Sequence, residues 1–225
     1  MKTVLITGGS VRLGKAIAAR LRAEGWRVIT SSHRADAGAD IVADLAEPMG
    51  AAKLYAAALK LLDGNPPDAL VNNAALFTGD GAAITAVNLE APKKLTTLMA
   101  GRETGLGAVV NILDSGILGS LESMGSNAKD LKDSNDPKRP YLSSKCELAA
   151  FTRSAAATFA ATLRVNGVAP GPVLAPTEVH TKAGEMLLDH RPTPDDVAAA
   201  VSYLLSAEST TGAVIPVDSG QHLLP

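Results

Sequence analysis

Short apolar runs alternate along the chain with longer segments in which apolar residues recur about every three to four positions. In the first pair, the run Lys2–Thr7 leads into Lys15–Glu24, where Ile17, Ala18 and Leu21 have helical spacing. The other apolar runs predict strands at Arg27–Ser31, Ile41–Ala43, Ala69–Val71, Ala108–Leu113, Arg164–Ala169 and Ala213–Val217. Helical periodicity predicts helices at Gly50–Leu62, Ile84–Met99, Tyr141–Leu163 and, capped by Thr193, through Leu205. This order predicts an α/β fold over residues 1–225, a single domain with a doubly wound parallel sheet of about seven strands flanked by helices.

Two segments depart from a simple sheet covered by helices. The helix predicted at Tyr141–Leu163 is apolar on nearly all sides, which predicts that a second subunit covers the face that the sheet leaves free. We therefore expect a homo-oligomer, either a dimer or a tetramer. Residues 115–140 are polar and long for a connection, so we expect a loop or flap insertion there. A solvated loop and a flap over a site are both open alternatives.

Composition narrows the classes of function. The 225 residues carry a net charge of −2, which gives no reason to expect binding to nucleic acid or to an anionic membrane. The single cysteine, Cys146, forms no internal disulfide, and this suits a reducing cytoplasm. The N-terminus enters the first predicted strand without a signal-like region, and no apolar run approaches the roughly 18 residues of a spanning helix. We expect a cytoplasmic protein that acts on a small molecule, with no metal site.

The first predicted strand is followed by a glycine loop, TGGSVRLG, at residues 7–14. Gly8 and Gly9 allow a tight turn and a close backbone approach to a ligand, and Gly14 allows close packing of the next helix. A helix N-terminus in that position binds a pyrophosphate through its free N–H groups and its dipole. The loop therefore predicts a dinucleotide site, in which Ser10 and Leu13 also take part.

The end of the second predicted strand indicates which dinucleotide binds. NAD sites usually carry an acid there for the ribose hydroxyls, but this strand runs into His33 and Arg34, with no carboxylate before Asp36. A guanidinium holds a 2′-phosphate, and Arg12 and Arg34 are predicted to converge on one from two loops. We expect NADPH/NADP as cofactor, favoured over NADH by about tenfold or more; two solvated arginines are the alternative. The adenine is expected to lie against the residues after the third strand, Asp44 and Leu45.

Tyr141 and Lys145 stand four residues apart at the start of a predicted helix and therefore share one side of it. A phenol has an ordinary pKa of about 10, which is too high for ready proton exchange at neutral pH. A neighbouring ammonium stabilises the phenolate and lowers that pKa, so the pair suits a general acid beside a hydride donor. Tyr-x-x-x-Lys alone is commonplace. It gains weight here from motifs at successive strand ends, Asn72-Asn73-Ala74 and Pro170-Gly171.

Together these motifs resemble the short-chain dehydrogenase/reductase family over nearly the whole chain. The resemblance implies a Rossmann fold with strand order 3-2-1-4-5-6-7. It implies that Tyr141 is the acid, and that Lys145 bonds the nicotinamide ribose and lowers the pKa of the tyrosine. It also implies that Asn88, in the stretch VNLEAP, holds a water of the proton relay. The further residues implied beside the cofactor are Asn72, Asn73, Ala74, Pro170, Gly171 and Val173.

The fifth predicted strand runs into Asp114 and Ser115, at the place where the family normally carries a serine beside the tyrosine. Alignment on the family pattern puts Asp114 at the serine position. Ser115 is the alternative, although a shift of one residue along a strand points to the opposite face. Bonding of Asp114 to local backbone only is also open, because strand ends favour such bonds.

Four features resemble the pteridine reductase and dihydromonapterin reductase branch of that family. They are the Asp–Tyr–Lys set, the arginine in the glycine loop, the His33-Arg34 pair, and Phe77, three residues after Asn-Asn-Ala. The resemblance implies that a pterin stacks on Phe77 and contacts Asp114 and Tyr141; plain packing of Phe77 is the alternative. We expect an NADPH-dependent reductase of a C=O or C=N bond, with a pterin-like substrate favoured. The alternatives are a carbonyl reductase of another small ketone or aldehyde, and an NADP(H)-sensing protein without turnover.

Overall fold

The computed structural model describes residues 1–103, 105–118, 139–173 and 186–224. Strands and helices alternate through these residues as the hydrophobic pattern predicts. The strands are β1 (Thr3–Thr7), β2 (Arg27–Ser32), β3 (Ile41–Val42), β4 (Ala69–Asn72), β5 (Gly107–Ile112), β6 (Leu163–Pro170) and β7 (Val214–Val217). The α-helices are α1 (Arg12–Ala23), α2 (Gly50–Leu61), α3 (Gly81–Thr85), α4 (Ala91–Ala100), α6 (Arg139–Thr158) and α7 (Pro194–Ser206). The short helical turns are η1 (Ala35–Ala37), η2 (Ala86–Glu90), η3 (Ser115–Ile117) and η5 (Gln221–Leu223).

The strands form one parallel, seven-stranded sheet in the order β3-β2-β1-β4-β5-β6-β7. This confirms the predicted single-domain Rossmann fold and its strand order. The strand order reverses at β1: β2 and β3 lie on one side of it, and β4 to β7 lie on the other. Leu5 of β1 pairs with Ile29 of β2 and with Leu70 of β4. Open α/β sheets bind ligands at the carboxyl ends of the strands beside this reversal.

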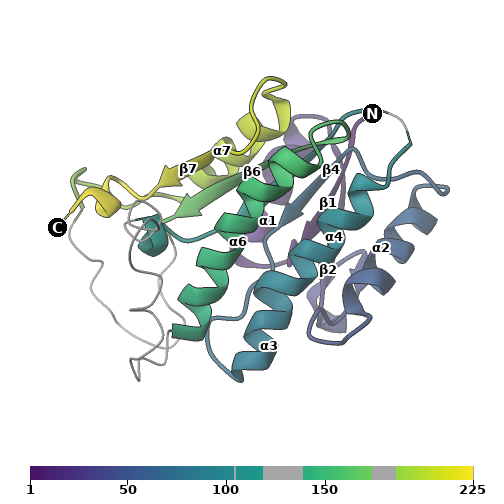
Figure 1. The fold of residues 1–225 in the computed structure, drawn as a ribbon, viewed down its shortest axis with the longest axis horizontal. Coiled ribbons are helices and arrows are strands. Elements are labelled where there is room, and N and C mark those ends of the chain that lie inside the picture. The colour runs from purple at the N-terminus through teal and green to yellow at the C-terminus, as the bar shows by residue number, and fades with distance from the viewer. Residues whose placement is uncertain (104, 119–138, 174–185, 225) are drawn as a thin grey trace.

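Two layers of helices cover the sheet. Figure 1 shows α4 and α6 side by side in front of the strands, with α2 beside α4 and with α1 and α7 behind. Successive side chains of β1 point to opposite faces of the sheet and pack against different helices. Leu5 packs with the front helices, whereas Val4 and Ile6 pack with α1 and α7. Because both faces of the sheet are buried, the strands have apolar runs in place of alternating polar residues.

Two predicted helices have different limits in the structure. The helix expected at Ile84–Met99 consists of three consecutive pieces, because the π-helical turn η2 separates α3 from α4. The helix expected at Tyr141–Leu163 begins earlier, at Arg139, and ends at Thr158, so Leu163 belongs to β6. Apolar residues continue through the turn that joins α6 to β6. Periodicity alone therefore did not mark the end of the helix.

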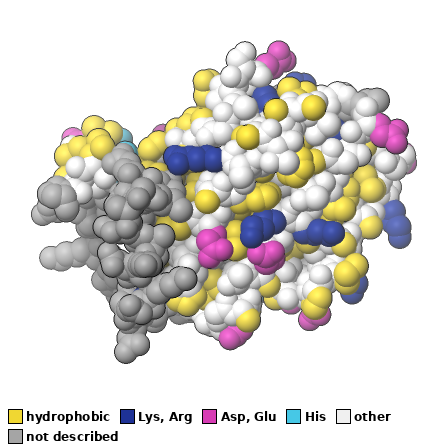
Figure 2. Space-filling view, viewed as in Figure 1, with side chains coloured by type: hydrophobic (Ala, Val, Ile, Leu, Met, Phe, Trp, Pro, Cys, Tyr) yellow, Lys and Arg dark blue, Asp and Glu magenta, His cyan; other side chains and the backbone are white. Residues whose placement is uncertain are grey.

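Most of the predicted insertion at 115–140 lies outside the described residues, which omit 119–138. The outer side of α6 exposes Glu147, Arg153 and Ser154, so it is less apolar than the sequence suggested. Hydrophobic side chains still lie on the face of the molecule that carries α4 and α6, as Figure 2 shows. None of the described helices is long and apolar enough to cross a membrane. Within the same residues, no group of three or more His, Cys, Asp or Glu side chains is placed to hold a metal ion.

Candidate active site

A cavity of about 630 Å³ runs along the carboxyl ends of the strands from β1 to β6. It brings together most of the residues that the sequence singled out. Those that line it are Gly8, Arg12, Leu13, Gly14, His33, Arg34, Asp44, Leu45, Asn73, Ala74, Asp114, Tyr141, Lys145, Pro170, Gly171 and Val173. Those that do not line it are Ser10, Asn72, Asn88 and Phe77.

The glycine loop between β1 and α1 forms a cradle at one part of this cavity. A Cβ on Gly14 would stand 2.1 Å from the carbonyl oxygen of Gly8, so only glycine fits there. Gly8 itself has a left-handed φ of 63°. Asn73 holds the loop from the β4 side by donating from Nδ2 to the carbonyl oxygens of Thr7 at 3.0 Å and Gly8 at 3.1 Å. From the β2 side, the carbonyl oxygen of Ser31 accepts from the backbone N–H of Gly9 at 3.1 Å, so the loop backbone is fixed from both neighbouring strands.

Two features of this loop fit the pyrophosphate of a dinucleotide. The hydroxyl of Ser10 is buried and has no hydrogen-bond partner among the described residues, although buried hydroxyls nearly always have one. The first turn of α1 also has no side-chain cap for its free N–H groups. A phosphate at this helix N-terminus would satisfy both kinds of donor.

Arg12 occupies the first position of α1 with a φ of 49°, in the left-handed region. A glycine adopts this conformation at little cost, whereas a residue with a Cβ is strained in it. The backbone thus keeps a conformation typical of glycine although the residue is an arginine. The side chain is exposed and lines the cavity, and strain of this kind is usually retained where it serves a ligand.

Arg34 lines the same cavity and lies just after β2. Its Nε and Nη2 donate to the two carboxylate oxygens of Asp36 at 2.9 and 2.7 Å. The side chains of Arg34 and Asp36 are 63% and 69% exposed. The backbone N–H of Arg34 donates to Oγ of Ser32 at 3.0 Å. The sequence located this arginine correctly, but it gave no sign that the carboxylate two residues later would bind it.

At the opposite end of the cavity, the phenol of Tyr141 donates to Oδ2 of Asp114 at 2.7 Å. The other oxygen of that carboxylate accepts from the backbone N–H of Gly116 at 2.8 Å. Asp114 therefore makes the local bond and the bond to the tyrosine together. Ser115 is buried at the start of η3 and does not line the cavity. Of the two alternatives, it is Asp114 that contacts Tyr141.

Lys145 lies one helical turn from Tyr141 on α6 and is almost fully buried. Its Nζ donates to the carbonyl oxygen of Ile112 at 2.7 Å and lies 5.7 Å from the centre of the Tyr141 ring. Burial lowers the pKa of Lys145 to about 8, against the opposing effect of the Asp114 charge. Its ammonium is therefore poised to titrate near the physiological range.

Burial raises the pKa of Tyr141 well above its ordinary value, and the charge and hydrogen bond of Asp114 raise it further. This contradicts the expectation that Lys145 lowers it. The physical reason is that the nearest partner of the phenol is a carboxylate, which accepts its proton in a hydrogen bond and repels a phenolate. Tyr141 therefore keeps its proton throughout the neutral range.

A family model described as enoyl-(acyl carrier protein) reductase matches residues 11–222, which is nearly the whole chain. The chain belongs to the short-chain dehydrogenase/reductase family. Its relatives include glucose 1-dehydrogenase 2 of Bacillus subtilis, which is 29% identical over 100% of this chain and 96% of that protein.

Solved structures of the short-chain dehydrogenase/reductase fold also match over the full length. FolM alternative dihydrofolate reductase 1 from Brucella canis, complexed with NADP, is 30% identical with a TM-score of 0.81, over 100% of this chain and 95% of that chain. The 3-alpha-hydroxysteroid dehydrogenase from Pseudomonas sp. B-0831, complexed with NADH, is 26% identical with a TM-score of 0.77, over 97% and 96%. These two neighbours are complexed with NADP and with NADH respectively, and the names of the chain's relatives cover several substrates.

In this short-chain dehydrogenase/reductase, Asn88 lies buried in the π-helical turn η2. Its side chain accepts from the backbone N–H of Leu76 at 2.8 Å and donates to the carbonyl oxygen of Leu76 at 2.9 Å. It also donates to Oγ of Ser144 at 3.1 Å. The amide therefore ties the loop after β4 to α6 and fixes Leu76, which lines the cavity. Its expected contact with a relay water stays a prediction.

Asn72 likewise serves the frame of the site in the described structure. Its Nδ2 donates to Oδ1 of Asn111 on β5 at 2.8 Å, and Asn111 donates in turn to Oγ1 of Thr152 on α6 at 2.9 Å. All three side chains are buried. This chain of bonds joins two strand ends to the helix that carries Tyr141, so Asn72 contributes to the placement of the phenol from a distance.

Phe77 does not line the cavity but lies against its reactive phenol. The rings of Phe77 and Tyr141 meet edge to face, with centroids 4.8 Å apart and an interplanar angle of 62°. Phe77 is 50% exposed, so half of this large apolar side chain faces outward at the reacting end. A phenylalanine used only for packing would normally be more deeply buried.

The sequence interpretation missed the apolar part of the cavity. Six such residues are Ala75, Leu76, Val87, Ile112, Leu113 and Pro172. Ile112 and Leu113 end a predicted strand, and Ala75, Leu76 and Pro172 lie three to five residues beyond one, so nearness to a strand end was the signal that could have identified them. They bring a largely apolar lining to the space beside Tyr141, which favours an organic substrate over a highly charged one.

Proposed function

We propose that this enzyme is an NADPH-dependent reductase of a C=O or C=N bond, and that its substrate is a flat, pterin-like ring. The observation that carries the proposal is the hydrogen bond from Tyr141 to Asp114 in a buried site next to Lys145. A phenol bonded to a carboxylate keeps its proton, and so it suits the donation of a proton in a reduction better than removal of one from an alcohol.

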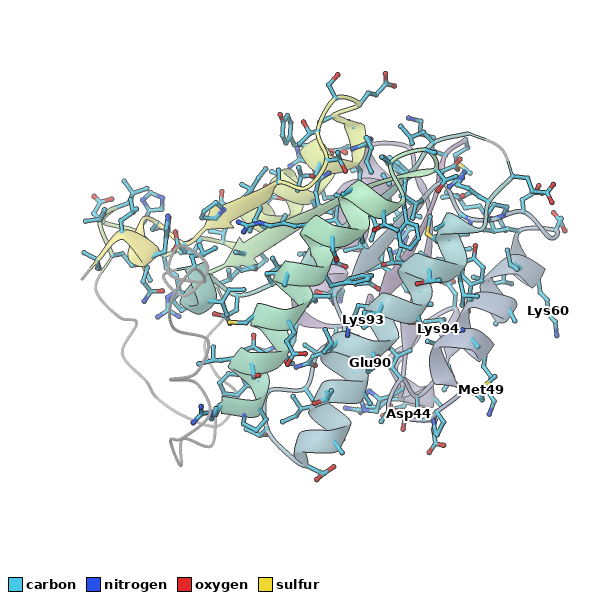
Figure 3. The ribbon with its side chains drawn as sticks, viewed as in Figure 1. Asp44, Met49, Lys60, Glu90, Lys93 and Lys94 are labelled. Carbon is cyan, nitrogen blue, oxygen red and sulfur yellow. The ribbon has the colours of Figure 1, made fainter. Side chains whose placement is uncertain are left out.

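The residues present fit the cofactor along the whole cavity. The glycine cradle, the free hydroxyl of Ser10 and the N-terminus of α1 would hold the pyrophosphate. Arg12 and Arg34 would hold the 2′-phosphate, and Asp44 the adenine. Figure 3 shows Asp44 at the end of the sheet opposite the chain's N-terminus. Bound NADPH supplies the hydride.

Four side chains would take part in proton transfer. Tyr141 donates it from its phenol oxygen to the oxygen or nitrogen of the reduced bond. Lys145, as an ammonium, offsets the negative charge left on the phenol, and its own position is fixed by the bond to Ile112. Asp114 orients the phenol O–H, and it would contact a ring nitrogen of a substrate stacked beside it. Asn88 would act further back, as a holder of water in the relay.

The pterin-like substrate rests on Phe77 and on Asp114 together. Phe77 presents an exposed aromatic surface beside Tyr141, and an aromatic surface suits a flat conjugated ring. A carboxylate at the reacting end suits a ring that carries N–H donors. The FolM reductase, a structure similar over the whole chain, is described as an alternative dihydrofolate reductase, which supports the same class of substrate.

A screen of NADPH oxidation against dihydropterins, quinones and small carbonyl compounds tests the proposal. We expect turnover of a dihydropterin and a fall in kcat/KM of about tenfold in Phe77→Ala, because stacking and burial on that ring are lost. Tyr203→Ala, which removes another half-exposed aromatic ring on α7, serves as the matched control and should change nothing. Ketone turnover that is indifferent to Phe77→Ala would contradict the pterin proposal.

The second candidate is a carbonyl reductase of another small ketone or aldehyde. The names of the relatives favour it, because they include a glucose dehydrogenase and hydroxysteroid dehydrogenases. A third candidate, an NADP(H)-sensing protein without turnover, requires that NADPH bind tightly while Tyr141→Phe changes nothing that can be measured. The same screen separates all three.

We also propose that the protein acts in the cytoplasm as a homo-oligomer, either a dimer or a tetramer. Half-buried Leu142 and Phe151 on α6 and the hydrophobic side chains visible in Figure 2 support a second subunit on that face. The single, buried Cys146 suits a reducing compartment. Light scattering on the purified protein measures the subunit number, and a monomer would contradict the proposal.

A further inference from the structure

The exposed corner of the cavity holds an ion pair that a cofactor phosphate would have to meet. Asp36 takes two hydrogen bonds from Arg34, one from Nε and one from Nη2, at 2.9 and 2.7 Å. These two donors form one edge of the guanidinium, which is the same edge that binds a phosphate with two parallel bonds. Asp36 therefore already occupies the donors that would otherwise be free for the 2′-phosphate.

The local backbone places Asp36 beside the cavity without making it part of the lining. Arg34 and Ala37 both line the cavity, and the turn η1 runs between them from Ala35 to Ala37. Gly38 ends this turn in the left-handed conformation, with a φ of 64°. The turn thus brings the carboxylate back toward the arginine that precedes it by two residues.

Asp36 carries a negative charge at neutral pH, as an aspartate ordinarily does, and the hydrogen bonds and charge of Arg34 lower its pKa further. A bound 2′-phosphate carries negative charge as well, so the two anions compete for one guanidinium and repel one another. Nothing comparable affects a cofactor without that phosphate, since its ribose hydroxyls are uncharged. The effect of Asp36 therefore differs between NADPH and NADH.

We propose that Asp36 sets the strength of NADPH preference, because it competes with the 2′-phosphate for Arg34 and holds the affinity for NADPH below what the arginine alone would give. The proposal rests on the role of Arg34 in binding that phosphate. It assigns a function to a residue that neither lines the cavity nor belongs to the reacting end.

Titration calorimetry of the full-length protein with NADPH, NADH and 2′,5′-ADP tests this without any turnover. We expect Asp36→Asn to bind NADPH and 2′,5′-ADP about three- to tenfold more tightly, as fits the loss of an exposed ion pair and a like-charge contact. The affinity for NADH should stay within about twofold. Both side chains at this corner are exposed, so the variant is expected to fold normally.

Glu90→Gln is the matched control, because Glu90 makes an exposed ion pair with Lys93 at 3.0 Å outside the cavity. Figure 3 shows Glu90 and Lys93 labelled near each other on the side of the molecule that carries α4. The substitution removes one negative charge and one exposed ion pair, as Asp36→Asn does. It should leave the affinities for all three ligands unchanged, which separates the local effect of Asp36 from the effect of net charge.

Arg34→Ser, alone and combined with Asp36→Asn, tests the competition by Asp36 separately from the proposed binding of the 2′-phosphate by Arg34. If Arg34 holds the phosphate, Arg34→Ser weakens NADPH binding by about tenfold or more, and Asp36→Asn then improves it much less in that background than in the wild type. If Arg34→Ser leaves NADPH binding unchanged, the proposed role of Arg34 fails. A third outcome is that Arg34→Ser weakens NADPH binding, while Asp36→Asn alone leaves it as in the wild type or weakens it. In that case only the competition by Asp36 is overturned.

Discussion

Near each end of the cavity, an aspartate accepts hydrogen bonds from a side chain to which we assign a function. Asp36 accepts from Arg34 and Asp114 accepts from Tyr141, and the shortest bond in both pairs measures 2.7 Å. The side chain of Arg34 is 63% exposed, whereas Tyr141 is only 8% exposed. Water and salt screen the first pair, and burial strengthens the second.

Hydrogen bonds of the same length therefore have different effects at the exposed end and at the buried end. At the exposed end, an aspartate can change an affinity severalfold, because each exposed ion pair contributes little. At the buried end, an aspartate changes the protonation of a reacting group, since burial and the carboxylate act in the same direction on the pKa of Tyr141. Cofactor preference is thus open to fine adjustment, while the reacting end depends on each group being present.

The largest expected effect is at the buried end. Tyr141→Phe removes the proton donor and leaves its ring in place, so we expect kcat to fall by about 10²–10⁴-fold. The affinity for NADPH should change little, and titration in the absence of substrate measures it. Tyr203→Phe, on the exposed side of α7, is the control and should retain full activity. Full activity in Tyr141→Phe would contradict the role of the phenol as the proton donor.

Asp114→Asn should have the next largest effect. It keeps the shape of the side chain but removes the charge, so the pKa of Tyr141 should fall back toward its ordinary value. The reduction should nevertheless slow by about 10- to 150-fold, because the proposed contact of the carboxylate with a ring N–H of the substrate is lost, and a hydrogen bond to a charged group contributes about 1.5–3 kcal/mol. Ultraviolet titration of the tyrosines, compared with Tyr141→Phe, reports the pKa.

Asp36→Asn is the control for the rate of reduction and the tyrosine titration measured with Asp114→Asn. It makes the same chemical change at the exposed end, and it should leave both the pKa of Tyr141 and kcat as they are. The contrast between the two aspartates would be lost if both substitutions moved the tyrosine titration, or if neither did.

The third prediction concerns the pH dependence of reduction. Lys145 has a pKa of about 8 because it is buried, so its ammonium loses a proton as the pH rises through that value. The phenol stays protonated in this range, and what is lost is the cation that offsets the developing phenolate. We expect kcat for reduction to be level below about pH 7 and to fall up to about tenfold per pH unit well above pH 8. A rate that stays level up to pH 10 would contradict this assignment.

The elements of the fold could be predicted to this extent because most strands are apolar runs followed by a helical pattern, as in Lys2–Thr7 and Lys15–Glu24. The end of α6 could not, since apolar residues continue from Thr158 through the turn to Leu163 in β6. The π-helical turn η2 was also not visible, because a hydrogen bond to the fifth residue leaves almost the same hydrophobic pattern as one to the fourth.

For the site, residue types at strand ends predicted which side chains meet, and most of them do line one cavity. Their partners were harder to predict. The sequence suggested that Lys145 would govern Tyr141, but the phenol bonds Asp114, and which way its pKa moves depends on burial and distance. Likewise Arg34 was placed correctly, whereas its bond to Asp36 depends on the turn η1, which needs the folded backbone.

The smallest expected effect lies in the glycine loop, where Arg12 has a left-handed φ of 49°. Arg12→Gly relieves that strain at the cost of a more flexible unfolded chain, so we expect a gain of about 0.5–1 kcal/mol in the free energy of unfolding. Urea unfolding without cofactor measures it. NADPH should bind about tenfold more weakly, because one guanidinium at the 2′-phosphate is lost.

Asp63→Gly separates these two effects of Arg12→Gly. Asp63 also has a left-handed φ, of 54°, and lies after α2, outside the cavity. Its replacement should give a similar gain in stability with no change in NADPH affinity. If Arg12→Gly gains stability and also retains NADPH affinity, then the arginine is no part of the phosphate site, and Arg34 with Asp36 would determine the choice of cofactor without it.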